Sequence, residues 1–200
     1  MKTWPWWPVP SEPGEILDFW FGREDEPGYG EFRDEWFQKD EAFDNEVRER
    51  FLDDYERAAR GEYEGWQEEP ESCLALVIVL DQFPRNLFRG DARTHATDDR
   101  ALEISESAIE RELDRKLPPF QRMFLYMPFM HSEDVVVQRR SVELYESLAA
   151  AENGRDVSDF AVSHRDIVER FGRFPHRNAL LGRDTTPEEA AFLKKPGSSF

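Results

Sequence analysis

Apolar residues recur at helical spacing along almost the whole chain. Between residues 40 and 61, Phe43, Val47, Phe51 and Tyr55 fall four residues apart, so they share one face of a helix. A similar spacing returns in four later segments, which are residues 97–117, 132–150, 158–172 and 186–193. Because nearly every segment follows this period, the sequence predicts an all-α fold of about eight to ten helices joined by short loops.

The ends of the predicted helices carry residues that helix termini favour. Gly61 follows the first of these helices, and glycine is common just past a helix C-terminus. Thr97 and Ser132 are predicted to cap their helices, because a side-chain oxygen there accepts hydrogen bonds from free backbone N–H groups. Thr186 and Glu189 have the spacing of a capping box, which predicts a further short helix near the C-terminus.

The most apolar stretch, CLALVIVLDQF (residues 73–83), is ambiguous between a strand and a helix. Pro70 and Pro84 bracket a length that is typical of a helix, and no other segment offers a partner strand. The sequence therefore predicts a buried central helix that ends before Pro84. The stretch is far too short to span a bilayer.

Two segments that are distant in the sequence share one pattern of residues. DQFPRNLFRG (residues 81–90) and GRFPHRNALLGR (residues 172–183) each place Phe-Pro after a predicted helix, and Arg-Asn follows. Proline lacks a backbone N–H and restricts the residue before it, so it is predicted to end the preceding helix in both. The two Arg-Asn pairs would then project from similar corners, and the sequence leaves open whether those corners face each other.

Length and charge limit the classes of protein to which this chain can belong. A chain of 200 residues predicts a single domain, residues 1–200. Its net charge of -17 opposes binding to nucleic acid or to an anionic membrane, so neither is expected as a partner. Cys73 is the only cysteine, and the N-terminal residues lack the pattern of a signal peptide. The expected location is therefore the cytoplasm.

The two ends of the chain are expected to differ from the helical body. Residues 1–12 are rich in Trp and Pro and are predicted to form an arm that lies across the body, because exposed Trp side chains would make a sticky surface. An exposed strip that binds a partner is the alternative. Residues 194–200 are predicted to form a C-terminal tail.

Longer motifs occur in a fixed order along the chain, namely LDQFPRNLFRG, ATD, FLYMPFMHSED and HRDIVERFGRFPHRNALLGR followed by TPEEAAFL. With ILDFWFG and WFQKDEAFD near the N-terminus, they cover nearly the whole sequence. In these motifs the chain resembles the bacterial family called domain of unknown function 924. The resemblance implies a fold similar to tetratricopeptide-type helical-hairpin proteins, and it implies no activity. The family pattern commonly has Phe at the position of His95, so His95 is not taken as a site residue.

Positive charge gathers at two places in this acidic chain. Residues 163–183 hold five arginines and two acidic residues, and residues 85–93 hold three arginines and one aspartate. The planar group of arginine binds carboxylate or phosphate through two parallel hydrogen bonds. We therefore predict a pocket for a small anion or an acidic peptide terminus, formed by Asp81, Arg85, Asn86, Arg89, His131, Glu133, Arg173, His176, Arg177 and Asn178.

Each residue type has a distinct role in this predicted pocket. The arginines would hold the anion, the asparagines would orient it, and the histidines would add donors that depend on pH. The two carboxylates, Asp81 and Glu133, would position the arginines. The competing interpretation is structural, because the same arginines could pair with carboxylates of the chain and hold helix ends together.

A hydrolase is the alternative function, with His131, Glu133 and His176 as candidate catalytic residues. A metal-assisted version would add His164 to that set as a ligand. Structural interpretations compete here too, because Glu133 suits the positive end of a helix and His164 lies on an apolar stripe. No metal or other cofactor is predicted. A second alternative is a scaffold whose partner is another protein.

Overall fold

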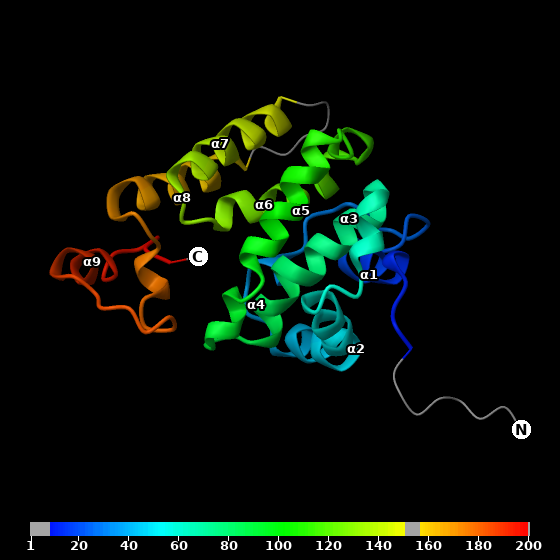
Figure 1. Cartoon of the computed structure of the whole chain (residues 1–200), viewed down its shortest axis with the longest axis horizontal. Coiled ribbons are helices and arrows are strands. Elements are labelled where there is room, and N and C mark those ends of the chain that lie inside the picture. Colours follow the sequence, from blue (N-terminus) through cyan, green and yellow to red (C-terminus); the bar gives the residue numbers. More distant parts are fainter. Residues whose placement is uncertain (1–8, 151–156, 200) are drawn as a thin grey trace, which may run out of the picture.

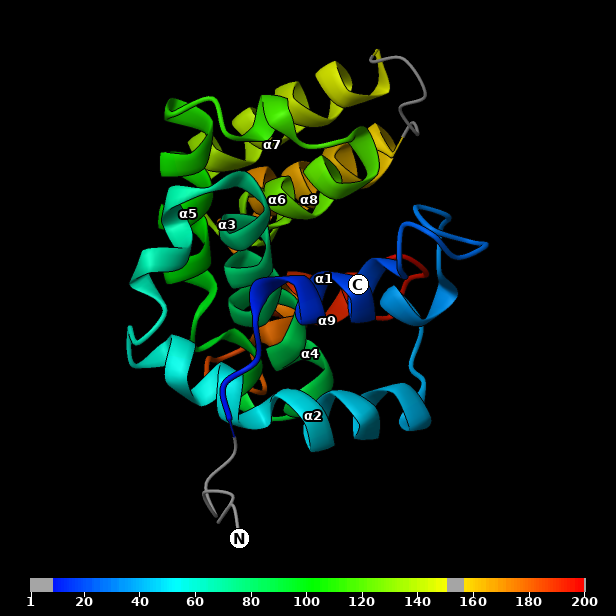
Figure 2. The same cartoon turned by 90° about the vertical axis from the view of Figure 1, so that its right-hand side faces the viewer.

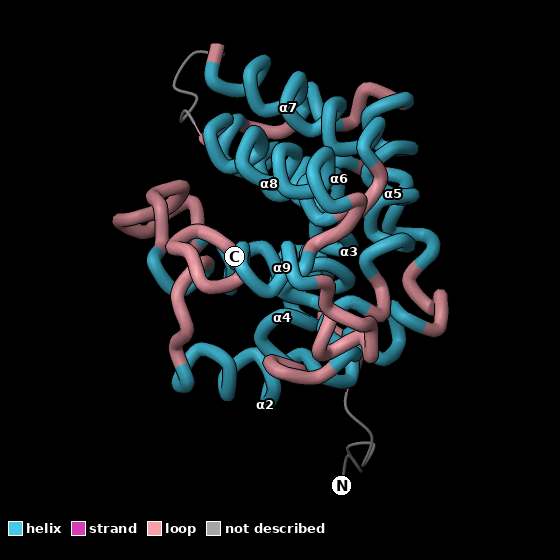
Figure 3. Tube along the Cα trace, turned by 90° about the vertical axis from the view of Figure 1, so that its left-hand side faces the viewer, coloured by secondary structure: helices cyan, strands magenta, loops and turns pink. Residues whose placement is uncertain are grey.

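The computed structural model describes residues 9–150 and 157–199, and in these ranges the chain forms helices and no strand (Figure 1, Figure 3). The α-helices are α1 (Pro13–Phe21), α2 (Glu41–Ala59), α3 (Pro70–Val77), α4 (Phe83–Leu87), α5 (Asp98–Glu110), α6 (Pro119–His131), α7 (Val135–Ala149), α8 (Ser158–Phe171) and α9 (Pro187–Phe192). The predicted all-α class is confirmed. The tetratricopeptide-type array of hairpins stays a prediction.

Shorter helical turns connect these elements. The 3-10 helices are η1 (Asp34–Trp36), η2 (Glu64–Glu68), η4 (Ala92–His95), η5 (Asp114–Lys116) and η6 (Pro175–Arg177). A π-helical segment, η3 (Ile78–Gln82), joins α3 to α4. The helices expected from apolar spacing correspond to α2, α5, α7, α8 and α9, and their presence is confirmed.

The helices form two groups that α3 and α5 connect. Helices α6, α7 and α8 pack against one another at one end, and α2 packs against α4 at the other (Figure 1, Figure 2). Helix α1 lies against α3, while α5 contacts both α3 and α6. Helix α9 and the C-terminal segment lie to one side of this body (Figure 1, Figure 3). Within the described ranges, no helix has both the length and the apolar character of a membrane span.

The N-terminal arm falls partly outside the described residues, because residues 1–8 are not among them. The arm's described end is tied to α2. Ser11 donates from its backbone N–H and from its hydroxyl to the two carboxylate oxygens of Asp54, at 3.0 and 2.8 Å. Tyr63 also donates to Asp54, at 2.5 Å, so this buried carboxylate joins the arm, α2 and the turn that follows α2.

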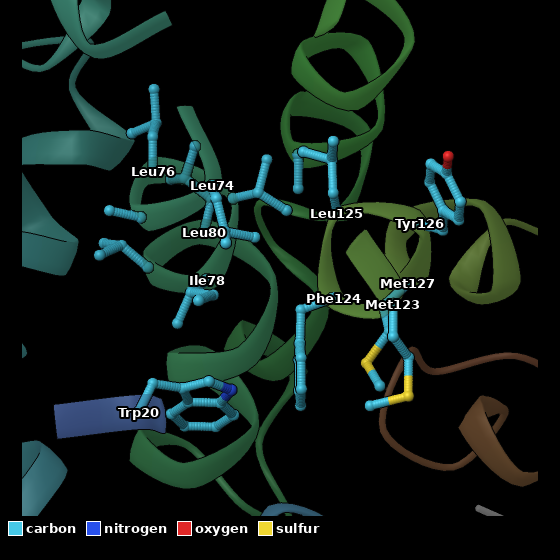
Figure 4. Close-up of a cluster of buried hydrophobic side chains, with 14 of the residues drawn as sticks. Trp20, Leu74, Leu76, Ile78, Leu80, Met123, Phe124, Leu125, Tyr126 and Met127 are labelled. Carbon is cyan, nitrogen blue, oxygen red and sulfur yellow. The ribbon is translucent and has the colours of Figure 1, made fainter. Parts of the chain in front are cut away.

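The core is rich in aromatic side chains. Trp20 on α1 is fully buried, and its ring packs against Phe83 and Phe124 with centroid separations of 5.8 and 5.6 Å. Figure 4 shows Trp20 and Phe124 side by side below the apolar residues Leu74, Leu76, Ile78 and Leu80, with Met123 and Met127 beyond Phe124. Because aromatic rings bury large apolar areas, this cluster holds α1, α4 and α6 together.

The central apolar run is helical but does not end before Pro84, so that prediction was wrong. Residues 70–87 form one continuous helical run in which η3 lies between α3 and α4. Phe83 donates its backbone N–H to the carbonyl of Ile78, five residues back, instead of four residues back as in an α-helix. The wider turn accommodates a proline, which has no N–H to donate and would clash in a regular helix interior.

The backbone carbonyl of Leu80 lacks its usual helical donor because residue 84 is a proline, and the hydroxyl of Thr97 donates to it instead. In a regular α-helix, residue 84 would donate to the carbonyl of Leu80, but a proline cannot. The hydroxyl of Thr97 donates to that carbonyl at 2.5 Å, across the contact between η3 and α5. Thr97 does stand before the first residue of α5, but its side chain makes no capping hydrogen bond, so its predicted role was wrong.

Two further end signals differ from their predictions. Helix α7 is capped by Asp134, which accepts hydrogen bonds from the N–H groups of Val136 and Val137, and not by Ser132. The helix begins later than its apolar pattern suggested, so Asp134 occupies the capping position. Helix α8 ends at Gly172, whose φ of 68° is left-handed, and Pro175 begins the following η6 instead of ending α8.

The capping box at Thr186 is confirmed. The Thr186 hydroxyl accepts from the N–H of Glu189, and the Glu189 carboxylate accepts from the N–H of Thr186. The C-terminal segment also has a small apolar cluster of its own, in which Ile167, Val168 and Phe174 pack together. Because Ile167 and Val168 belong to α8 and Val135 of α7 packs against them, this cluster joins the segment that leads to α9 to the helical body.

We expect Thr97→Val to destabilise the protein by about 1–2 kcal/mol, because the Leu80 carbonyl would lose a buried hydrogen-bond donor. Thr97→Ser is the matched control, since it keeps the hydroxyl and removes a methyl group. Urea unfolding followed by circular dichroism would measure both. Equal losses in the two variants would contradict a role for this hydrogen bond.

Candidate functional site

Asp98 connects the two Arg-Asn corners of the chain. Its Oδ1 lies 3.0 Å from Nη2 of Arg85 on α4, and its Oδ2 lies 3.6 Å from Nη1 of Arg177 on η6. The corners therefore face each other across one carboxylate. Burial raises the pKa of Asp98, but the charge of Arg85 and a hydrogen bond with His95 outweigh burial and hold that pKa well below its ordinary value.

Asp81 in η3 holds the imidazole of His131. The side chain of Asp81 is fully buried, and its Oδ1 lies 2.7 Å from Nδ1 of His131. Its Oδ2 accepts a hydrogen bond of 2.5 Å from the amide of Gln82. Arg85 approaches Oδ1 to 3.5 Å and also donates to the backbone carbonyl of Asp81. Asp81, Arg85, Asp98, His131 and Arg177 are called the Asp98 centre below.

The charges in the centre fix the proton on one nitrogen of His131. Burial raises the pKa of Asp81, but Arg85 and His131 outweigh burial and lower it, so the carboxylate is ionised. Burial and the charge of Arg85 lower the pKa of His131, so its ring is neutral at pH 7. The proton of that neutral ring lies on Nδ1, where Asp81 accepts it, and Nε2 therefore carries the lone pair.

Asn86 and Arg89 turn away from the Asp98 centre toward α2. The amide of Asn86 donates to Oδ1 of Asp44 at 2.8 Å. Arg89 donates from Nε and Nη2 to the two oxygens of the same carboxylate, at 2.6 and 2.9 Å. These contacts tie α4 to α2, which is the structural role that the sequence left open for the arginines.

Arg173 and Asn178 are likewise engaged outside the centre. Arg173 donates to both carboxylate oxygens of Glu189 on α9, at 2.6 and 2.9 Å. The amide of Asn178 lies 3.3 Å from Oε2 of Glu189. The hydrogen bond from Arg173 and those from the backbone and side chain of Thr186 hold the pKa of Glu189 at about 2. This carboxylate fixes α9 against the η6 corner.

Glu133 attaches the C-terminal segment to the end of α6. Its carboxylate accepts hydrogen bonds of 2.6 and 3.0 Å from Arg183 and one of 2.7 Å from the backbone N–H of Phe174. Burial raises the pKa of Glu133, but the hydrogen bonds from Arg183 and Phe174 outweigh burial and lower it. These contacts hold the segment that carries Arg177 beside the body.

Two other histidines lie close to the centre. Nδ1 of His164 lies 2.7 Å from the backbone carbonyl of Phe160, and burial lowers the pKa of His164 to about 3. Burial and the charge of Arg177 lower the pKa of His176 to about 4. Both rings pack against Phe174, with centroid separations of 5.6 Å. His164 and His176 are therefore neutral parts of the packing at neutral pH.

The residues proposed for a hydrolase lie near one another, but their hydrogen bonds go to different partners. Glu133 is bound by Arg183, whereas Nδ1 of His131 faces Asp81. Ser132 accepts a hydrogen bond from the backbone N–H of Asp134, and Ser163 donates to the carbonyl of Asp159 within α8. In the described part of the chain, no three His, Cys, Asp or Glu residues are placed to share a metal ion.

Arg177 is the least completely paired of these arginines. The residue is only 6% exposed, and its Nε has no hydrogen-bond partner among residues 9–150 and 157–199. The guanidinium lies over the ring of Phe174, 4.5 Å from its centroid, and its ion pair with Asp98 spans 3.6 Å. Burial lowers the pKa of Arg177 to about 10, so the group is charged at neutral pH. A buried donor left without a partner is unfavourable by about 1–3 kcal/mol.

Two cavities lie elsewhere, on the side formed by the loop after α1. One of about 480 Å³ is lined by parts of α1, residues 27–33 and α2, including Asp18, Glu31 and Arg50. A smaller one of about 130 Å³ is lined by apolar side chains that include Phe120 and Met123 of α6. Residues of the Asp98 centre line neither of them.

Sequence reasoning missed Asp98 and Arg183. Asp98 stands at the start of α5, where an acidic side chain is common because it interacts with the positive end of the helix. The ATD motif that contains Asp98 was the available signal, because a carboxylate there has no apolar pattern to explain it. Arg183 belongs to the basic segment of residues 163–183 but lies outside the set that the sequence predicts for the pocket.

The fold and this centre define an all-helical protein in which a buried ionic cluster joins two distant corners of the chain. The chain belongs to the family described as bacterial protein of unknown function (DUF924), whose pattern matches residues 16–197. It is similar to the solved structure of the protein of unknown function ATU0120 from Agrobacterium tumefaciens, with 47% sequence identity and a TM-score of 0.80. That similarity covers 91% of this chain and 96% of the other. No curated protein matches the sequence.

The neutral state of the buried histidines predicts a loss of stability in mild acid. The pKa of His164 is about 3 in the folded protein, well below the ordinary value of 6.5. The unfolded chain therefore takes up a proton below about pH 6.5 that the folded chain does not, and stability falls as the pH falls toward that lower pKa. The contribution approaches about 1.4 kcal/mol per pH unit for each such histidine.

We expect His164→Phe to reduce the slope of stability against pH between about pH 6.5 and pH 4.5, above the range in which most carboxylates titrate. Phe keeps a ring against Phe174 and cannot be protonated. Urea unfolding at a series of pH values would measure the slope. An unchanged slope in the variant would show that His164 does not cause the acid sensitivity.

Proposed function

We propose that the Asp98 centre binds a small oxyanion, either free or as the acidic end of a peptide, with Arg177 as its main donor. The observation that carries this proposal is the buried guanidinium of Arg177, whose Nε has no partner in the described part of the chain and whose ion pair with Asp98 spans 3.6 Å. Carboxylate and phosphate both present two oxygens at the spacing of the arginine fork. Either would supply the hydrogen bonds that Arg177 lacks.

Neighbouring groups support Arg177 in this role. Arg85 on the facing corner is held by Asp81 and Asp98, so its position is fixed before a ligand arrives. Asp98 keeps both guanidinium groups charged in a largely buried place. A pre-arranged set of donors lowers the conformational cost of binding.

The proposed set is smaller than the one predicted from the sequence. Arg85, His131 and Arg177 would contact the anion, and Asp81 and Asp98 would position them. Most of the other residues of the predicted pocket bind Asp44, Glu189 or Arg183, and His176 packs against Phe174, so these residues would support the framework. The hydrolase alternative has less support, because Glu133 and His164 are engaged with other groups.

Arg177→Met tests the proposal. An apolar side chain of similar length removes one positive charge beside Asp98, so the melting temperature should fall, because the remaining buried carboxylate is less completely compensated. The same change should abolish stabilisation by acetate or inorganic phosphate. In the wild type, that stabilisation should grow with ligand concentration and reach about 2.7 kcal/mol at 100 times the dissociation constant. Thermal unfolding at constant ionic strength, adjusted with sodium chloride, would measure both effects.

Arg173→Met is the matched control for charge and size. Arg173 makes two hydrogen bonds to Glu189, so its loss should lower stability while the response to the anion is kept. The proposal fails if neither anion stabilises the wild type more than sodium chloride does. It also fails if Arg177→Met and the wild type respond equally.

A further inference from the structure

His131 presents an open nitrogen at the Asp98 centre. Among the described residues, its hydrogen bonding goes through Nδ1 to Asp81, while Nε2 carries the lone pair of the neutral ring. The side chain is 14% exposed, and Nε2 is not one of the fully buried polar atoms that lack a partner among the described residues, so solvent reaches it. A lone pair accepts a hydrogen bond and repels an anionic oxygen, so a neutral His131 opposes an anion bound beside it.

The formal charges of the Asp98 centre also oppose the binding of an anion. Arg85 and Arg177 carry two positive charges, and Asp81 and Asp98 carry two negative charges. The centre is therefore neutral before a ligand arrives, and an added anion would leave a net negative charge in a partly buried place. Such a charge is unfavourable unless a compensating positive charge arrives with it.

We propose that the anion enters the Asp98 centre together with a proton, which binds Nε2 of His131; this inference rests on the proposed function above. Nε2–H then donates to an oxygen of the anion, while Nδ1–H continues to donate to Asp81. No bond other than N–H forms, and the proton comes from solvent. His131 thus becomes a ligand-contacting residue whose protonation selects an anion over a neutral ligand.

The groups around His131 favour this arrangement. Asp81 and Arg85 face it from the 78–87 run, Asp98 from α5 and His164 from α8. Arg85 and burial keep the free ring neutral, whereas Asp81 and Asp98 favour the charged ring. A bound anion would add a third negative group beside the ring, which shifts the balance toward the imidazolium.

Calorimetric titration with acetate would test the proposal in the full-length protein. Acetate stays ionised above about pH 6, so any proton taken up comes to the protein. Titrations in two buffers of different ionisation enthalpy give the number of protons bound per acetate. We expect a number approaching one at neutral pH, and an affinity that weakens by up to about tenfold per unit as the pH rises.

His131→Gln separates this inference from a general effect of pH. The glutamine amide is a permanent donor that needs no proton, so acetate binding should persist with no proton uptake and a flat dependence on pH. His95→Gln is the matched control, because it alters a histidine beside Asp98 and should keep the uptake.

The possible outcomes are distinct. Acetate binding to the wild type without proton uptake overturns this inference and leaves the proposed function standing. Uptake that persists in His131→Gln assigns the proton to another group and also overturns it. Absence of acetate binding to the wild type overturns the proposed function and this inference together. If His131→Gln does not fold, the buffer dependence of the wild type still decides the question.

Discussion

The missing amide hydrogen of Pro84 is the constraint on which the Asp98 centre depends. It leaves the Leu80 carbonyl without its α-helical donor, and the chain meets this need with a π turn and the hydroxyl of Thr97. That hydrogen bond fixes the start of α5 against the central run. Asp98 is the next residue, so its carboxylate comes to lie beside Arg85. A local backbone defect thereby determines a contact between charged groups that are distant in sequence.

The second requirement is that the C-terminal segment stays in place. Its own apolar cluster is small, and its links to the body are largely polar, through Glu133 to Arg183 and through Asp98 to Arg177. Glu133 satisfies Arg183 with two short hydrogen bonds, whereas Asp98 is shared with Arg85 and lies farther from Arg177. Both guanidinium groups keep an Nε without a partner among the described residues, but Arg183 is hydrogen-bonded to its carboxylate and Arg177 is not. This contrast distinguishes a structural ion pair from a group that is available to a ligand.

Apolar periodicity predicted the helices well, because burial of one face is a property of each segment alone. The Phe-Pro motifs predicted two corners, but the structural cause differs at each, with a π turn at Pro84 and a left-handed glycine before Pro175. The partner of an arginine could not be predicted in this way. Arg85 and Arg89 lie one turn apart, yet one reaches Asp98 and the other Asp44, because different helices pack on the two sides. Such pairing depends on tertiary packing, which a single sequence does not display.

The charge of the whole chain bears on what the centre can bind. A net charge of -17 produces a field that repels anions at long range, so attraction must come from donors close to the ligand. Buried arginines provide such donors, because low polarity strengthens a direct hydrogen bond to a charged oxygen. The same low polarity favours loss of the proton from an isolated guanidinium. Asp98 keeps the guanidinium protonated, but its negative charge offsets the positive charge that would attract an anion. A neutral centre with an open histidine resolves the conflict, because the missing positive charge can arrive from solvent as a proton when the anion binds.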